Sequence, residues 1–132
     1  MPKTNILKST SEFTPDAVIS AEEEKSTFAN LSASLAEIRK LKGVIGYILR
    51  NDVSAIIDLA LPEKLTDYAL FSYEINEVCQ DMIKSFSLGE TESMLVEGEK
   101  VKILCMNIAE NKVSVFMEKN ATHAWIIKRI LL

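Results

Sequence analysis

Residues 43–63, GVIGYILRNDVSAIIDLALPE, decide the fold. Two runs rich in aliphatic and β-branched residues, 44–50 and 53–61, are typical of strands. Only Asn51-Asp52 separates them, and this pair tolerates a positive φ in a tight turn. The stretch therefore predicts a β-hairpin.

A helix is predicted immediately before this hairpin. Ser20 and Glu23 form a capping-box pattern, and the acidic start and basic end of the segment suit the helix dipole. Apolar residues recur at helical spacing on one face: Phe28, Leu31, Leu35 and Ile38. With Gly43 as a left-handed stop, we expect a helix over about residues 21–41 that lies on an apolar surface.

A longer helix follows Pro62 and continues to about Gly89. Its helical repeat is typical of a face packed on a sheet: Leu65, Tyr68, Ser72, Ile75, Cys79, Met82 and Phe86. The repeat predicts about six turns.

Three strand-like runs close the sequence pattern, at about 91–97, 100–108 and 112–119. Turns are expected at residues 98–99 and 110–111. A last helix is expected over 121–132, with Asn120 as its N-cap.

The resulting order is α-β-β-α-β-β-β-α, which predicts an α+β fold: one five-stranded antiparallel sheet with helices on both faces. A chain of 132 residues has room for one domain. We expect residues 1–19 to form a flexible leader and residues 20–132 to form that domain.

Composition excludes several classes of function. A net charge of −4 without a basic stripe argues against a nucleic-acid partner. No segment reaches the roughly 20 apolar residues that span a bilayer, and the first residues lack the apolar core of a signal peptide. Cys79 and Cys105 are isolated and read as free thiols. We therefore expect a cytoplasmic protein.

The order and lengths of these elements resemble the roadblock / dynein light-chain family over about residues 21–132, a layout shared with profilin and longin domains. The resemblance is carried by residues 43–46 (GVIG), by the hairpin running into residues 56–58 (IID), and by the strand pair 101–108 and 113–117. One position differs, because family members often have Asp-Gly at the hairpin turn where this chain has Asp52-Val53. The turn is therefore expected to shift toward residues 50–52.

This resemblance implies a third strand at the sheet edge and a homodimer formed through the long helix and that edge. It also implies a regulator or scaffold of a small Ras-like GTPase, or a cargo-linking subunit of dynein.

The residues themselves indicate a partner surface on the long helix, because its apolar side chains spread over about half of the circumference, more than one sheet needs. We predict an interface on this helix and the edge strand: Asp67, Leu70, Phe71, Glu74, Glu77, Val78, Asp81, Met94 and Val96. The alternative is a wide core face with one ordinary exposed leucine, Leu70.

Negative charge is concentrated in the same region. Residues 63–99 hold nine acidic side chains against two lysines. Such a run is either a solvated face or a docking surface for a basic partner. The alternating Glu92 and Glu97 of the edge strand are also compatible with charges that block edge pairing.

The sequence offers little support for a catalytic function. His123 is the only histidine and has no nucleophile or orienting group in a recognisable motif. No metal-ligand pattern and no phosphate-binding glycine loop is present, so we expect no cofactor, no metal and no bound GTP. If this protein activates a GTPase, we expect it to position the GTPase's own catalytic groups. Arg39 and Arg50 are the two residues that could instead act as an arginine finger, which would contradict this expectation.

A small-molecule sensor domain of similar layout is the second functional hypothesis. Its pocket would draw on Tyr47, Cys79, Met82, Cys105 and Met106, although an apolar core needs the same residues.

Overall fold

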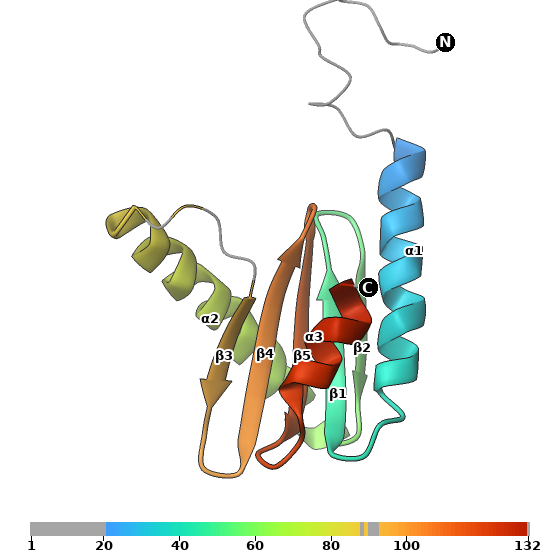
Figure 1. The fold of residues 1–132 in the computed structure, drawn as a ribbon, viewed down its shortest axis with the longest axis vertical. Helices are drawn as coiled ribbons and strands as arrows, with labels where there is room; N and C mark the ends of the chain where they lie inside the picture. Colours follow the sequence, from blue (N-terminus) through green and yellow to red (C-terminus); the bar gives the residue numbers. More distant parts are fainter. Residues whose placement is uncertain (1–20, 88, 90–92, 132) are drawn as a thin grey trace, which may run out of the picture.

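The computed structural model describes residues 21–87, 89 and 93–131 of the chain. It contains three α-helices, one 3-10 turn and five strands in these residues (Figure 1). In chain order they are α1 (Ala21–Ile38), β1 (Val44–Arg50), β2 (Ala55–Leu59), η2 (Pro62–Lys64), α2 (Leu65–Ser85), β3 (Ser93–Glu97), β4 (Val101–Ile108), β5 (Asn111–Glu118) and α3 (His123–Leu131). The predicted order of elements is confirmed.

The five strands form one antiparallel sheet in the order β2-β1-β5-β4-β3. Helices α1 and α3 lie on one face, and α2 lies on the other (Figure 1). The predicted α+β class, with helices on both faces, is therefore confirmed. Strand β3 lies at an edge, as the resemblance implies.

The face under α1 and α3 holds the larger core. Leu35 and Ile38 of α1 and Ile126 of α3 are fully buried there against the sheet. Alternate residues of the strands supply the other half, including Val113 and Val115 of β5. Because strand side chains alternate between faces, these positions leave the neighbouring residues to the opposite side.

The face under α2 holds a smaller core. Its fully buried members are Ile48, Ile103, Cys105 and Phe116. The Tyr68 ring of α2 stacks on the Phe116 ring, with centroids 4.6 Å apart. This contact anchors the first turns of α2 on the middle of the sheet.

The hairpin turn differs from the expectation of a two-residue connection. The last β1–β2 pair is Arg50 with Ala55, so four residues form the loop. The Asn51 side-chain oxygen accepts hydrogen bonds from the backbone N–H groups of Val53 and Ser54, at 2.9 and 2.8 Å. This side-chain cap builds the turn without a positive φ, so Val53 belongs to the loop and not to β2.

Other boundaries also differ. Helix α1 ends at Ile38, and a bond from Leu41 N–H to the Ile38 carbonyl continues it only as tight turns before Gly43, which has a φ of +88°. The β4–β5 turn uses residues 109–110, with Asn111 already in β5. Helix α3 starts at His123, so Asn120 is not its N-cap. Residues 1–19, Ser20, Thr91 and Glu92 lie outside the described residues.

Gly46 is required where β1 and β2 approach each other. A Cβ at this position would lie 2.3 Å from the Asp58 carbonyl oxygen and 2.7 Å from the Leu59 Cα. Both are backbone atoms, which cannot move without opening the strand pair. The glycine therefore fixes the start of the hairpin that the sequence predicts.

Candidate protein-binding interface

The most buried residues of helix α2 are polar, whereas several of its large apolar side chains are exposed to solvent. Its two fully buried residues are Ser72 and Asn76, which are 1% and 2% exposed. Large apolar side chains lie on its exposed surface and on the residue that follows it: Leu65, Leu70, Phe71, Tyr73, Val78, Met82 and Phe86. Because Tyr68, Ala69 and Ile75 pack on the sheet, α2 carries apolar side chains on both its covered and its exposed sides, more than an ordinary surface helix.

The expected sheet-facing repeat is correct for the middle of α2 and wrong at its two ends. Tyr68, Ser72, Ile75 and Cys79 lie on the sheet side, whereas Leu65, Met82 and Phe86 are exposed. Figure 1 shows the reason for the C-terminal end, because the last turns of α2 extend past β3 and have no sheet beneath them. The prediction also missed Asn76, because a polar residue is not expected at a buried position.

The buried polar groups of α2 are satisfied within the helix. The Ser72 hydroxyl donates to the Ala69 carbonyl at 3.1 Å, and the Asn76 amide donates to the Ser72 carbonyl at 3.1 Å. Neither needs a partner from the sheet. These small, self-satisfied side chains let α2 lie close to the strands, while Tyr68, Ala69 and Ile75 supply its apolar contact with the sheet.

An apolar seam runs along the flank of α2. It consists of Phe71, Ile75, Val78 and Met82, whose spacing of four, three and four residues is that of a helix prepared to pack on a second helix. Ile75 is partly buried and the other three are exposed. Ile75 packs against the sheet core, and no described element of the chain covers the exposed side chains of the other three.

The seam is continuous with the β3 edge of the sheet. Phe71 and Val96 line the same apolar cleft, of about 210 Å³, together with Val101 and Ile103. Met94 and Val96 are partly buried on the α2 face of β3. The structure therefore brings together the predicted helix residue Phe71 and the predicted strand residue Val96.

The remaining predicted residues form a separate acidic face on α2. Leu70, which is 57% exposed, lies about 100° around the helix from Phe71. It is surrounded on the helical surface by exposed acids: Asp67, Glu74, Glu77 and Asp81. Within the described part of the chain, none of these carboxylates forms an ion pair. Glu90 and Glu92, which belong to the same acidic run of the sequence, lie outside that part.

Both arginines weighed as arginine fingers are engaged within the chain. Arg39 Nε lies 3.4 Å from the Asp58 Oδ1, which ties the end of α1 to β2. The Arg50 guanidinium lies over the Tyr73 ring, 5.4 Å from its centroid, on the flank of α2 away from β3. Arg50 flanks the hairpin turn, as expected, but no sequence pattern predicted its contact with Tyr73.

Chemically reactive groups do not gather at one place. His123 opens α3, as expected, and its Nδ1 lies 3.2 Å from the Lys102 Nζ. Both cysteines are free. Burial raises the pKa of the Cys105 thiol, although its contact with the Ser114 hydroxyl, 3.7 Å away, opposes this. Among the described residues no group of His, Cys, Asp and Glu could hold a metal ion.

The pocket proposed for a small-molecule sensor is not formed by its expected residues. Tyr47 and Met106 belong to the core under α1, whereas Cys105 faces α2 on the other side of the sheet. Met82 is exposed. Strand alternation separates these side chains, so they do not converge on one cavity.

The fold is that of roadblock domains. A crystal structure of a Roadblock/LC7 domain from Streptomyces avermitilis superposes with a TM-score of 0.61 and 11% identity, over 79% of this chain and 88% of that one. The gliding protein MglB from Thermus thermophilus gives 0.59 and 12%, over 85% and 84%. No protein-family model and no curated protein matches the sequence. None of the described helices is long and apolar enough to cross a membrane.

Proposed function

We propose that this chain is a non-catalytic, cytoplasmic binding module of the roadblock type, which forms a homodimer and regulates or scaffolds a small Ras-like GTPase. The observation that carries the proposal is the exposed apolar seam of helix α2, which adds to the apolar contact that Tyr68 and Ala69 already make with the sheet. The class of partner is taken from the resemblance to the roadblock family, and the fold shared with a Roadblock/LC7 domain supports that choice.

The apolar seam fits a second copy of α2. Phe71, Val78 and Met82 extend over about three helical turns, which is the length over which two helices bury a continuous strip. In a two-fold dimer the same residues meet their own equivalents, so one self-complementary stripe is sufficient.

The free edge of β3 extends this interface. Strand β3 pairs with β4 on one side only, and the Phe71–Val96 cleft connects the edge to the seam. Two copies related by a two-fold axis would join their β3 strands while their α2 seams pack together. Both the backbone groups of the edge and the apolar side chains of the seam would then be covered.

The acidic face of α2 stays exposed in such a dimer and supplies the contact with the GTPase. Its unpaired carboxylates favour a basic surface on the partner, and Leu70 provides an apolar centre. Because Arg39 and Arg50 are held within the chain, the module would act by positioning the GTPase's own catalytic groups.

The dimer is tested with a double substitution in the seam, Phe71→Asp with Val78→Asp. Buried charges would face their equivalents across the two-fold axis, so we expect a folded monomer in light scattering. Leu70→Asp is the matched control, because it lies on the acidic face and should leave the dimer intact. A seam variant that remains dimeric would overturn this interface.

The GTPase contact is tested by measuring GTP hydrolysis of small GTPases isolated from the native cell, with and without this protein. We expect binding that weakens with salt and is lost in Glu74→Lys with Asp81→Lys. Glu37→Lys with Glu110→Lys is the control, since Glu37 is an exposed acid of α1, on the other face of the sheet, and Glu110 is exposed in the β4–β5 turn. A dimer that binds no GTPase would favour a cargo adaptor.

A further inference from the structure

Helix α3 exposes the only tryptophan of the chain on the side opposite α2. Ile126 is buried in the α1-side core, and Ile127 and Ile130 pack partly against it. Trp125 points away from these contacts and is 65% exposed. An indole is the largest apolar side chain, and its exposure outside a core marks a surface that gains from being covered.

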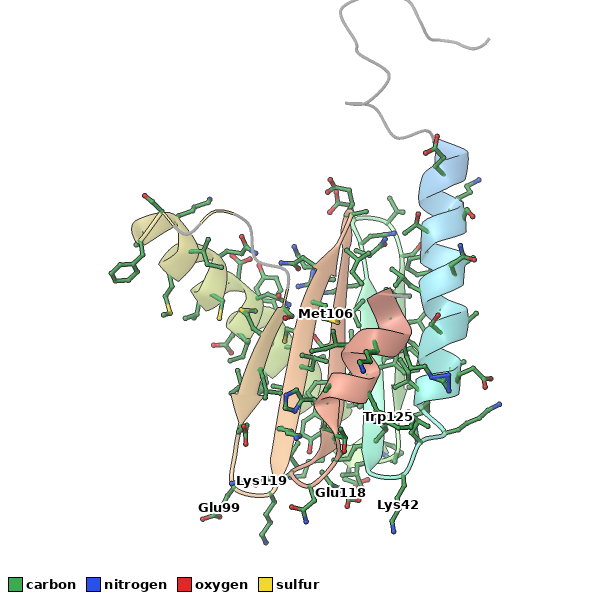
Figure 2. The ribbon with its side chains drawn as sticks, viewed as in Figure 1. Lys42, Glu99, Met106, Glu118, Lys119 and Trp125 are labelled. Carbon is green, nitrogen blue, oxygen red and sulfur yellow. The ribbon has the colours of Figure 1, made fainter. Side chains whose placement is uncertain are left out.

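The surface around Trp125 is hollowed. An open groove of about 760 Å³ is lined by Ser34 of α1 and by Trp125, Lys128 and Arg129 of α3. A second hollow of about 190 Å³ is also lined by Trp125, together with Lys42 from the turn after α1. Figure 2 shows Trp125 between α3 and α1, with Lys42 on that turn. The indole therefore borders two concave spaces.

The charge around both hollows has one sign. Among the described residues, those with a charge that line them are Lys42, Lys128 and Arg129, and none of the described acids contributes to either lining. In the described part of the chain none of these three cations forms an ion pair. The C-terminal dipole of α3 favours Lys128 and Arg129 but does not explain Lys42, which lies on another element.

We propose that this Trp125 groove, defined by Ser34, Lys42, Trp125, Lys128 and Arg129, is a second docking site that takes an acidic peptide segment with an apolar or aromatic anchor residue. The three cations would pair with carboxylates on either side of the anchor, and the anchor would lie against the indole. The concave shape favours a peptide over a membrane, because a bilayer surface is contacted by protruding side chains.

Binding is tested with the full-length chain and a synthetic fluorescein-labelled peptide in which glutamates and aspartates flank one phenylalanine. Fluorescence anisotropy should report saturable binding that weakens about fivefold or more as NaCl rises. Trp125 provides a direct readout, because it is the only tryptophan: an unlabelled version of the peptide should shift its emission to the blue and protect it from quenching. In the free protein, iodide should quench it more strongly than caesium.

Three comparisons decide the outcome. Lys128→Glu with Arg129→Glu should weaken the peptide at least about tenfold, whereas Lys25→Glu with Lys100→Glu, an equal change of charge elsewhere, should not. A peptide in which lysines replace the acids should not bind. Equal binding by both double variants would overturn the proposal, as would a response of Trp125 to vesicles of anionic lipid without a response to the peptide.

The site is independent of the proposed dimer. It lies across the sheet from α2, so the seam variant Phe71→Asp with Val78→Asp should bind the peptide unchanged. If Lys128→Glu with Arg129→Glu instead changed the oligomeric state, the groove would bind the acidic helix of another copy, and the peptide proposal would be wrong.

Discussion

The two faces of the sheet differ in how completely their helices bury apolar side chains. Under α1 and α3 the chain buries a continuous apolar core that includes Leu35, Ile38 and Ile126. Under α2 the core is smaller: the fully buried residues of the helix are Ser72 and Asn76, Tyr68 and Ile75 are only partly buried against the sheet, and Phe71, Val78 and Met82 are exposed. The first face is a closed core, whereas the second leaves apolar side chains exposed that the proposed partner would cover.

The largest expected effect on stability comes from comparing the same substitution, leucine to alanine, on the two sides of the molecule. Leu35→Ala on the closed face should lower the free energy of unfolding by about 2–5 kcal/mol, because Leu35 is fully buried and its removal leaves a cavity. Leu70→Ala on the exposed acidic face should change it by about 0.5 kcal/mol or less. Urea unfolding followed by circular dichroism measures both. Equal losses would show that α2 is packed as tightly as α1.

A smaller effect is expected for the buried polar residue under α2. Asn76→Ala removes one hydrogen bond within the helix and should cost about 1 kcal/mol in the same unfolding measurement. Asn76 is nearly as inaccessible as Leu35, so burial alone does not predict this difference. A loss as large as that of Leu35→Ala would mean that the polar side of α2 holds the fold together.

The smallest effect concerns the buried thiol on the α2 face. Burial raises the pKa of Cys105 above its ordinary value, so the folded state keeps the proton that the unfolded state loses first. Its contribution to stability is present below the ordinary pKa and is lost as pH rises through the folded pKa. We expect wild type to lose more stability than Cys105→Ala between about pH 8 and about pH 10. Parallel loss in the two proteins would contradict this.

Much of the fold follows from residues with a strong local signal. Two β-rich runs flanking Asn51-Asp52 predict the hairpin, and its strand β1 has the expected bounds. The loop is less predictable, since the Asn51 side chain caps two backbone N–H groups and removes Val53 from the strand. Side-chain caps depend on one rotamer, which periodicity does not report.

The candidate interface is predicted in part. The excess of apolar residues around α2 indicates a partner surface, and Phe71 and Val78 lie on the exposed seam. Met82 and Phe86 are expected against the sheet because they continue the helical repeat, yet both are exposed. The repeat gives their direction around the helix axis, but it contains no information on where the sheet ends.

The sequence by itself determined the order of elements, the hairpin and the unusual breadth of the apolar surface of α2, because these depend on neighbours within a few residues. Only the tertiary structure decided which side of α2 is covered. Tyr68 stacks on Phe116 and places Ser72 and Asn76 over the sheet, and the last turns then pass the β3 edge. The same holds for the Trp125 groove, since α1 and α3, about 90 residues apart in the chain, are neighbours only because both pack on the same face of the sheet.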